Sequence, residues 1–225
     1  MDNQIAQQDT APDDAPAQAG PRARQKARTR ARILQCALEA FAEKGFEGAS
    51  VREIAASAGV NHGLIRHHFK DKDRLWKAAV TFLFERLDEE MAPPNGRDLT
   101  GLDGLKDWIR RYVRYCARHP EHARIMVQES IRDSARLQWA VDTHIRPSHK
   151  RMMPVTRHYI RKGVYPDADP IMLMYILVAS AQMIFALGHE VRDTHGIEVD
   201  DPDFIDAHAD TIVSLFFDHR ADKSS

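Results

Sequence analysis

Residues 50–76 hold helix-start and helix-stop signals so closely spaced that only short helices fit between them. Ser50 and Glu53 have the spacing of a capping box, in which the hydroxyl and the carboxylate each satisfy a free backbone N–H at a helix start. Gly59 suits the left-handed conformation that ends a helix in a tight turn. Val60 is an apolar residue that can fill this turn from inside. We therefore predict a short helix after Ser50 and a turn at Gly59.

The second half of the same stretch predicts a second short helix. Asn61 is a good N-cap for a helix over about 62–68, in which Ile65 faces inward together with Phe69. Asp71 can cap the helix that follows. Two short helices around a turn of about three or four residues, with a buried apolar residue, form a helix-turn-helix. The second helix of this motif can enter the major groove of DNA with its N-terminus first.

Positive charge is concentrated around this motif. The whole chain has a net charge of −1, but residues 21–78 carry 13 bases against 6 acids. Residues 79–225 carry 19 bases against 23 acids. A compact basic segment ahead of a mildly acidic body indicates a module that binds a polyanion.

Residues 24–80 resemble the DNA-binding domain of the TetR family of transcriptional regulators. The family pattern is close to T-x-x-x-I-A-x-x-A-G-V-S-x-G-x-L-Y-x-Y-F-x-x-K-x-x-L. The positions of this chain that follow it, replacements included, are Ser50, Ile54, Ala55, Ala58, Gly59, Val60, Asn61, Gly63, Ile65, His68, Phe69, Lys72 and Leu75. Three positions depart from the pattern: Asn61 replaces the usual Ser, Arg66 the usual Tyr and His68 the second aromatic residue. Asn61 can still cap the helix, and Arg66 can reach a phosphate.

The resemblance implies a set of DNA contacts around the second helix. The expected contact residues are Arg28, Ser50, Arg52, His62, Gly63, Leu64, Arg66, His67 and Lys72. Among them, His62 and Leu64 lie at the helix start, where base edges are read. The basic run from Arg22 to Arg32 is expected to reach phosphates or an adjacent minor groove. Cations at a helix start oppose the helix dipole, so an external polyanion explains this run better than helix stability does.

The rest of the chain shows helical periodicity and no convincing strand. A first helix ends at Lys44-Gly45, and further helices are expected over about 102–118, 120–132, 134–162, 170–195 and 202–217. We predict an all-α fold of about nine helices, with a three-helix helix-turn-helix domain followed by a helical ligand-binding and dimerisation body. The expected divisions are a disordered tail over 1–20, the DNA-binding domain over 21–80, the body over 81–219 and a disordered tail over 220–225.

Two features of the body need a choice between interpretations. The helix expected over 134–162 contains Pro147 and Pro154, which should bend or split it, unless Pro147 begins a second helix at its first turn. The apolar run Ile171–Leu187 is at the short limit for a membrane span of about 20 residues, and it predicts a buried helix instead.

The N-terminus lacks the features of a signal peptide, and two cysteines cannot make a disulfide framework. A cytoplasmic protein without membrane contact is expected.

By the same resemblance, the last two helices should pair with those of a second copy in a four-helix interface. One face of the last helix carries the residues predicted for this homodimer interface: Ile205, Ala209, Ile212 and Phe216. The alternative is that these residues are buried within one subunit.

Regulators of this kind bind a small-molecule effector between the helices of the body. The candidates are aromatic, methionine and glutamine side chains on otherwise apolar faces, each of which can equally be core. They are Trp108, Tyr112, Met126, Gln128, Trp139, Met153, Tyr159, Tyr175, Gln182 and Phe185.

Twelve histidines leave two alternatives open, a metal-sensing regulator with the same DNA-binding domain and, more distantly, a helical metalloenzyme. The densest cluster, His119 and His122, is interrupted by Pro120 and is expected on the surface. HExxH, ExxH, nucleophile-elbow and phosphate-loop motifs do not occur. We therefore expect a regulator that is not an enzyme and has no metal or other cofactor, with double-stranded operator DNA, a small-molecule effector and a second copy of itself as partners.

Overall fold

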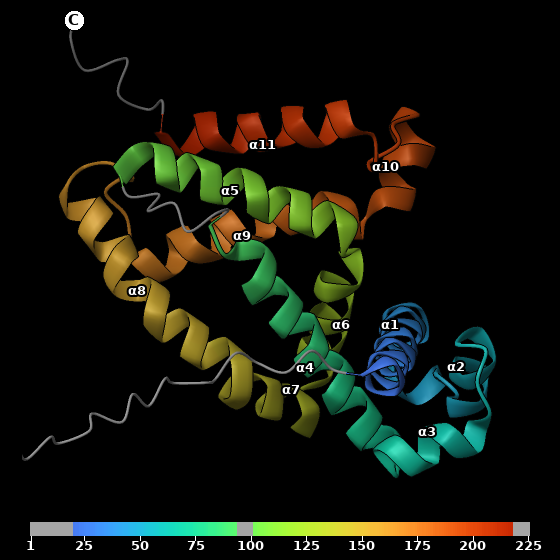
Figure 1. Cartoon of the computed structure of the whole chain (residues 1–225). Coiled ribbons are helices and arrows are strands. Elements are labelled where there is room, and N and C mark those ends of the chain that lie inside the picture. Colours follow the sequence, from blue (N-terminus) through green and yellow to red (C-terminus); the bar gives the residue numbers. More distant parts are fainter. Residues whose placement is uncertain (1–19, 94–100, 218–225) are drawn as a thin grey trace, which may run out of the picture.

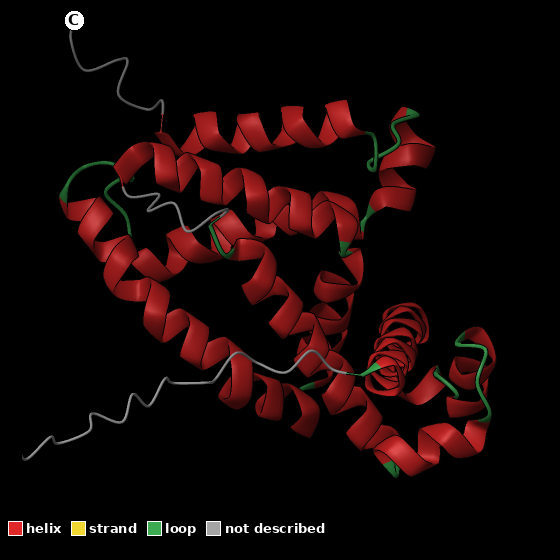
Figure 2. Ribbon diagram, viewed as in Figure 1, coloured by secondary structure: helices red, strands yellow, loops and turns green. Residues whose placement is uncertain are grey.

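The computed structural model describes residues 20–93 and 101–217, and every regular element in these residues is a helix (Figures 1 and 2). The helices are α1 Pro21–Gly48, α2 Val51–Ser57, α3 His62–Phe69, α4 Lys72–Met91, α5 Gly101–Arg118, α6 Pro120–Arg132, α7 Ala135–Ala140, α8 Arg146–Arg161, α9 Pro170–Ala186, α10 Gly188–His195 and α11 Pro202–Phe217. The all-α prediction is confirmed. Residues 1–19 of the tail predicted over 1–20, and the whole tail predicted over 220–225, lie outside the described residues.

The short helices of the helix-turn-helix begin and end where the sequence predicts. The Asn61 side chain accepts a hydrogen bond from the Gly63 N–H at 2.7 Å, and Asp71 accepts one from the Arg74 N–H at 2.8 Å. Gly59 has the left-handed φ of 61° that the turn requires. Each signal acts within a few residues of itself, so the motif is set by local chemistry.

The predicted capping box forms only in part. Ser50 Oγ accepts a hydrogen bond from the Arg52 N–H at 3.3 Å, as an N-cap should. The Glu53 carboxylate, however, is paired with Lys44 Nζ at 3.0 Å instead of the backbone N–H of Ser50. An ammonium group is a stronger partner for a carboxylate than a neutral amide is, and the end of α1 supplies one here.

The predicted end of the first helix at Gly45 is a sharp kink. Gly45 has φ 69° and ψ 173°, after which one more helical turn continues to Gly48. A Cβ atom at this position would lie 3.0 Å from side-chain atoms of Arg132 and Gln128 on α6. Glycine is therefore required here both by the backbone conformation and by the close approach of α6.

The segment predicted as one helix over 134–162 is continuous, with a π-helical turn over Val141–Ile145 between α7 and α8. Pro147 follows this turn directly, in the first turn of α8, where its missing N–H does the least damage. Pro154 lies inside α8 and removes the hydrogen bond to the carbonyl group four residues earlier. The prolines are accommodated without splitting the helix.

The prediction of a single helix over 170–195 is wrong, because α9 ends at Ala186, the chain bends at Leu187 and α10 begins at Gly188. Gly188 lies directly after the bend, and a Cβ atom on it would come within 2.8 Å of Val199. Glycine is therefore required at this position by the close packing of the following loop. None of the described helices is by itself long and apolar enough to cross a membrane. The α9–α10 pair passes that test only as two helices at 65° to each other.

Two hydrophobic cores organise the molecule. The head core is built by α1–α4, with Ile125 of α6 and Ala140 of α7 packed into it. The body core is built mainly by α5, α9 and α11. In Figure 1, α1–α3 lie at one end, and α4 and α6 lie between that end and the body. The boundary predicted at residue 80 falls inside the continuous helix α4.

Candidate functional site

The residues predicted to contact DNA come from four helices at the head end of the molecule. Arg28 lies on α1, Ser50 and Arg52 at the start of α2, five of them along α3, and Lys72 at the start of α4. The fold thus brings residues 28–72 to one end, as the helix-turn-helix prediction requires.

Helix α3 presents one exposed face to solvent. Gly63, Arg66 and His67 are exposed and have the spacing of one helix side, and Lys70, directly after the end of the helix, is exposed as well. The opposite side is held in the head core by Ile65. At the start of the helix, His62 is half-buried. This exposed face is therefore available to a DNA groove without any rearrangement of the head.

Two of the predicted contacts are partly used within the protein. Leu64 is half-buried and packs against the head core, which makes it less available to a thymine methyl group than predicted. Lys72 Nζ donates to the carbonyl oxygen of Glu47 at 3.1 Å and lies 4.7 Å from the ring centroid of Phe46. Lys72 therefore also stabilises the end of α1.

A candidate contact that the sequence interpretation missed is Lys70. It lies with Arg66, Lys72 and His62 around a shallow hollow of about 190 Å³ beside α3. Its φ of 65° and ψ of −58° form a tight turn closed by a hydrogen bond from the N–H of Asp71, and this conformation is strained for a side-chain-bearing residue. The only sequence signal for it was the basic excess of the segment.

The basic half of α1 lies next to the end of α3. The Arg30 guanidinium carbon is 5.9 Å from the ring centroid of Phe69. The pKa of His68 is lowered, first by burial and then by the charges of His67, Lys26 and Arg30. The cations of α1 and the exposed face of α3 therefore belong to one cationic surface, which suits a phosphate backbone.

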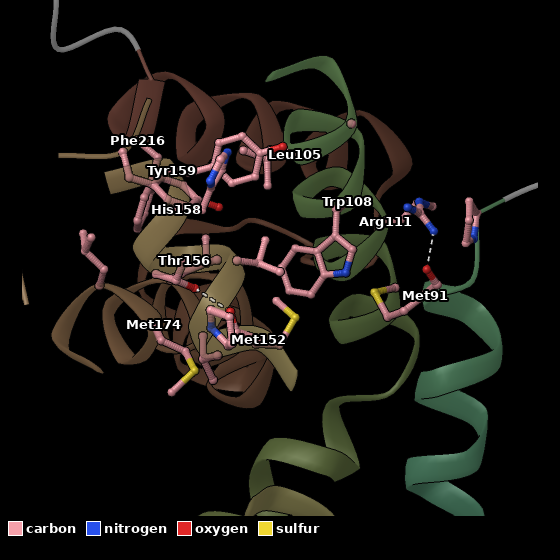
Figure 3. Close-up of a pocket in the computed structure, with 18 residues that line it drawn as sticks. Met91, Leu105, Trp108, Arg111, Met152, Thr156, His158, Tyr159, Met174 and Phe216 are labelled. Carbon is pink, nitrogen blue, oxygen red and sulfur yellow. Dashed lines mark hydrogen bonds between the residues drawn. The ribbon is translucent and has the colours of Figure 1, made fainter. Parts of the chain in front are cut away.

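The second candidate site is a cavity of about 790 Å³ in the body, within the usual range of about 300–1,000 Å³ for small-molecule sites (Figure 3). Helices α5, α8 and α9 supply most of its wall. The polar or ionisable lining residues are Arg111, Thr156, His158, Tyr159 and Tyr165, and the other lining residues are apolar.

Of the ten residues predicted to line an effector cavity, only Trp108 and Tyr159 do so. Three of the others lie at the junction between body and head. Met126 packs against the head core, Trp139 packs edge-on against the ring of Trp76, and Gln128 Nε2 donates to the carbonyl oxygen of Ala42 at 2.8 Å. Their apolar surroundings belong to the head core, which a helical pattern alone does not reveal.

The remaining five lie within the body but outside the cavity wall. Tyr112 and Gln182 are hydrogen-bonded to each other at 2.5 Å, and Phe185 is buried in the body core. Tyr175 is 59% exposed on the surface of α9. Met153 is half-buried on α8, next to the lining residue Met152. These five residues do not line this cavity.

An aromatic stack along α5 leads from the cavity toward the head. The cavity residue Trp108 stacks on Tyr112 with ring centroids 5.3 Å apart, and Tyr112 stacks on Tyr115 at 6.4 Å. The Tyr115 hydroxyl is hydrogen-bonded to Nδ1 of His122 at 2.9 Å. Rings on three successive turns of α5 are therefore in continuous contact between the cavity and α6.

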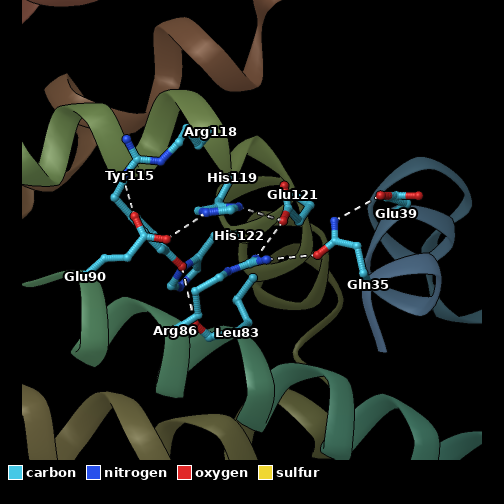
Figure 4. Close-up of polar contacts among 10 residues, drawn as sticks. All are labelled: Gln35, Glu39, Leu83, Arg86, Glu90, Tyr115, Arg118, His119, Glu121 and His122. Carbon is cyan, nitrogen blue, oxygen red and sulfur yellow. Dashed lines mark hydrogen bonds and ion pairs between the residues drawn. The ribbon is translucent and has the colours of Figure 1, made fainter. Parts of the chain in front are cut away.

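A polar network continues this path to α1 (Figure 4). Arg86 of α4 donates one hydrogen bond to Gln35 Oε1 on α1 and another to Glu121 Oε1 on α6, each at 2.8 Å. His119 contacts Glu121 at 3.4 Å and Glu90 of α4 at 3.0 Å. One guanidinium group thus joins the head helix α1 to the body.

His119 and His122 are more buried than the sequence predicts. His122 is 6% exposed and His119 is half-buried, so the surface location predicted for them is wrong. Burial lowers the pKa of His122 to about 4, and the ring stays neutral at neutral pH. Among the described residues, no group of three or more His, Cys, Asp or Glu side chains is placed to hold a metal ion.

The face of α11 predicted to form the dimer interface packs against other helices of the same chain. Ala209, Ile212 and Phe216 are 0%, 1% and 7% exposed and belong to the body core, so helices of the same chain already cover them in a single copy. Ile205 is half-buried against the same core. An apolar helix face has the same sequence pattern whether its partner helix belongs to the same chain or to a second copy.

Other apolar side chains of the last helices do face solvent. They are Ile171 (52%), Met172 (66%), Tyr175 (59%) and Ile176 (55%) on α9, and Leu215 (70%) on α11. Large apolar residues gathered on one helix in this way often mark an interface.

Two family models match consecutive parts of the chain. The model described as "Bacterial regulatory proteins, tetR family" matches residues 33–79. The model described as "YcdC-like protein, C-terminal region" matches residues 85–221, which is more than half of the chain. The first match includes the helix-turn-helix and the second the body.

Similar proteins are known from several bacteria. The HTH-type transcriptional regulator RutR of Escherichia coli K12 is 22% identical over 188 residues, which is 83% of this chain and 87% of that protein. The HTH-type transcriptional repressor SCO4008 of Streptomyces coelicolor is 29% identical over 66% of this chain and 74% of its own length.

Solved structures share the fold. HlyIIR, described as a hemolysin II transcriptional regulator, has a TM-score of 0.58 and 18% identity over 85% of this chain and 98% of its own. A TetR-like transcriptional regulator from Rhodococcus sp. RHA1 has a TM-score of 0.59 and 20% identity over 88% of this chain and 96% of its own.

Proposed function

Since the chain belongs to the TetR family of bacterial regulatory proteins, we propose that it is a ligand-responsive repressor that binds a palindromic DNA operator as a homodimer. Membership makes the chain a helix-turn-helix transcriptional regulator, and it sets aside the interpretation as a metalloenzyme. The operator symmetry, the effector and the dimer are the parts that we propose.

The observation that carries the DNA-binding part is the exposed face of α3 beside the basic half of α1. Arg66 and His67 are exposed on one side of α3, Lys70 is exposed directly after the helix, and Arg30 lies against the end of the same helix. A helix that presents cations over a buried opposite side can enter the major groove while α1 contacts the backbone. His62 at the N-terminus of α3 is our candidate for reading a base edge.

The cavity supports an effector site. Trp108 in its wall begins the aromatic stack on α5, and this stack ends at His122, next to the residues that Arg86 connects to α1. A ligand that favours one arrangement of α5 and α6 would shift the population of head positions, because these helices contact the head through specific side chains. We propose that such a ligand releases the DNA.

The homodimer is proposed to form through the exposed apolar residues of α9 and α11. Ile176, Met172 and Leu215 are more than half exposed in a single copy. Burying them against a second copy would remove this apolar surface from water and would set two heads at a fixed spacing.

Selection of bound sequences from a random DNA pool tests the proposal as a whole. We expect enrichment of an inverted repeat whose half-sites lie about one helical turn or a multiple of it apart. Enrichment of an asymmetric site would contradict the dimer, and no enrichment would contradict sequence-specific binding.

Arg66→Ala is expected to weaken binding to all DNA sequences and to reduce the slope of log affinity against log salt by about one, since one phosphate contact is lost. His62→Ala should instead relax the preference at one base position. Fluorescence anisotropy over a salt series, with selected and scrambled duplexes, measures both. Arg157→Ala, which removes an exposed cation from α8, is the control and should change neither quantity. An unchanged slope for Arg66→Ala would mean that this residue does not contact the backbone.

Ile176→Asp is expected to weaken the homodimer at least about a hundred-fold, because it places an unpaired carboxylate in each half of a symmetric interface. Sedimentation velocity should then show a monomer. The circular dichroism spectrum should remain that of the parent, which would show that the monomer is folded. Ile131→Asp is the matched control, because Ile131 is 80% exposed on α6, outside the proposed interface. A dimeric Ile176→Asp protein would place the interface elsewhere.

Ile212→Asp should unfold the body and not merely separate the two copies, since Ile212 is buried in the core.

A further inference from the structure

The wall of the body cavity is mostly apolar, and its basic side chains are Arg111 and His158. Its apolar part includes Leu105, Leu177 and Val178, and three thioethers, Met91, Met152 and Met174, which adapt to irregular apolar shapes. Trp108 adds a large ring (Figure 3). A surface of this kind gains free energy mainly by covering an apolar ligand.

The one arginine in the wall has its charge compensated within the protein. Arg111 Nε donates to Asp107 Oδ2 at 2.7 Å, on the same face of α5 one turn away. Its Nη1 donates to the carbonyl oxygens of Met91 and Ala92 at 2.6 and 3.0 Å. The guanidinium group therefore holds the end of α4 against α5. Asp107 lies outside the wall, but its carboxylate lowers the attraction of the Arg111 charge for an anionic ligand.

Besides Arg111 and His158, the polar groups of the wall are hydroxyls and one indole N–H. The Tyr159 hydroxyl accepts a hydrogen bond from the Gly101 N–H at 3.1 Å, which leaves its own proton available. Within the described residues, the hydroxyl of Tyr165 and the indole N–H of Trp108 have no hydrogen-bond partner. Burial raises the pKa of Tyr165 to about 12, so it stays a protonated donor.

We propose that the effector is an uncharged, largely apolar molecule that carries a hydrogen-bond acceptor such as a carbonyl or ether oxygen. Its apolar part would lie against the methionines and Trp108, and its acceptor would meet the hydroxyls of Tyr159 and Tyr165. Carboxylates, phosphates and sulfonates are disfavoured, because the one permanently charged cation of the wall, Arg111, is already compensated and does not replace their hydration. This inference rests on the proposed function only in calling the bound molecule an effector.

Two dyes of nearly equal shape test the charge selectivity. N-phenyl-1-naphthylamine is uncharged, and 8-anilinonaphthalene-1-sulfonate has the same rings with a sulfonate added. Both become fluorescent in an apolar site. We expect the purified full-length protein to bind the uncharged dye at least about ten-fold more tightly, a difference of about 1.4 kcal/mol.

Variants of neighbouring methionines locate the dye. Met152→Trp should fill part of the cavity and weaken binding of the uncharged dye about ten-fold or more. Met153→Trp is the matched control, because Met153 is half-buried on the same helix but lies outside the wall, and it should bind as the parent does. Fluorescence that survives Met152→Trp comes from dye bound elsewhere, and if it accounts for all the binding, the inference fails.

The role of Asp107 is tested by Asp107→Asn, which keeps a hydrogen-bond acceptor for Arg111 but removes the negative charge. Binding of the sulfonate dye should then tighten about ten-fold, while binding of the uncharged dye changes less than about three-fold. Asp210→Asn is the control, because Asp210 pairs with the neighbouring Arg110 outside the cavity at 2.8 Å. It should leave both affinities unchanged.

The outcomes separate the inference from the proposed function. Equal affinity for the two dyes, or no effect of Asp107→Asn on the sulfonate dye, would overturn the inference. Cavity binding with the expected selectivity would support it whether or not the uncharged dye releases selected operator DNA. Failure of the dye and of larger uncharged analogues to release DNA would count only against effector control.

Discussion

Arg86→Met is expected to lower the free energy of unfolding by about 3–5 kcal/mol, the usual cost of removing one partner from a buried ion pair. Arg86 and Glu121 have side chains only 16% and 9% exposed, and they are joined at 2.8 Å. Without the guanidinium group, Glu121 would retain a buried charge with only His119 beside it. The hydrogen bond to Gln35 on α1 would be lost as well.

Urea unfolding followed by circular dichroism measures this change. The double variant Arg86→Met with Glu121→Gln is the control, because it removes both charges. It should recover at least about half of the lost stability, since a buried pair replaced on both sides costs far less than a broken one. A single variant within about 1 kcal/mol of the parent would show that this pair is well hydrated and contributes little.

The protein is expected to lose roughly 3 kcal/mol of stability between pH 6.5 and pH 4 through His122 alone. Burial lowers the pKa of His122 from 6.5 to about 4, and the neutral ring is held by the Tyr115 hydroxyl and the edge of Phe84. In this window the unfolded chain binds a proton at His122 that the folded protein does not. Stability therefore falls as the pH falls from 6.5, and the effect is complete near pH 4.

His122→Gln should remove this part of the pH dependence. Unfolding free energies of the parent and the variant, measured between pH 7 and pH 4, should converge by roughly 3 kcal/mol toward the acid end. A chemical-shift titration of the His122 ring in the parent gives the pKa directly. An ordinary histidine pKa, or parallel stability curves, would contradict the prediction.

Below this pH range, both the parent and the His122→Gln variant should lose further folding stability. This loss comes from Glu121, which is present in both proteins. Burial by itself raises the pKa of this carboxyl group, but a hydrogen bond from His119 and the charge of Arg86 bring it below the ordinary value of 4.5. A carboxyl group with a lowered pKa in the folded state stabilises the protein above its unfolded pKa, and this contribution disappears as the pH falls through the folded value.

The sequence by itself determined the class of the fold and most helix ends. The residues that begin or end these helices act on backbone groups within a few residues, so their effect follows from the local chain. Examples are Asn61, Asp71, Gly59 and Pro202. The family pattern over residues 50–75 identified the helix-turn-helix for the same reason, since its apolar, capping and turn positions are all local.

Only the tertiary structure decided which partner each helix face meets. Ile212 and Phe216 pack inside one copy, whereas Ile176 and Leu215 face outward, although all four are equally apolar. The body cavity depends on the distances among α5, α8 and α9, so Tyr165 and Met152 could not be distinguished in the sequence from residues buried elsewhere. Arg86 gave no sequence signal either, because its partners are 35 and 51 residues away. Periodicity shows that a face is apolar but not what covers it, since that depends on how each helix is rotated and placed against its neighbours.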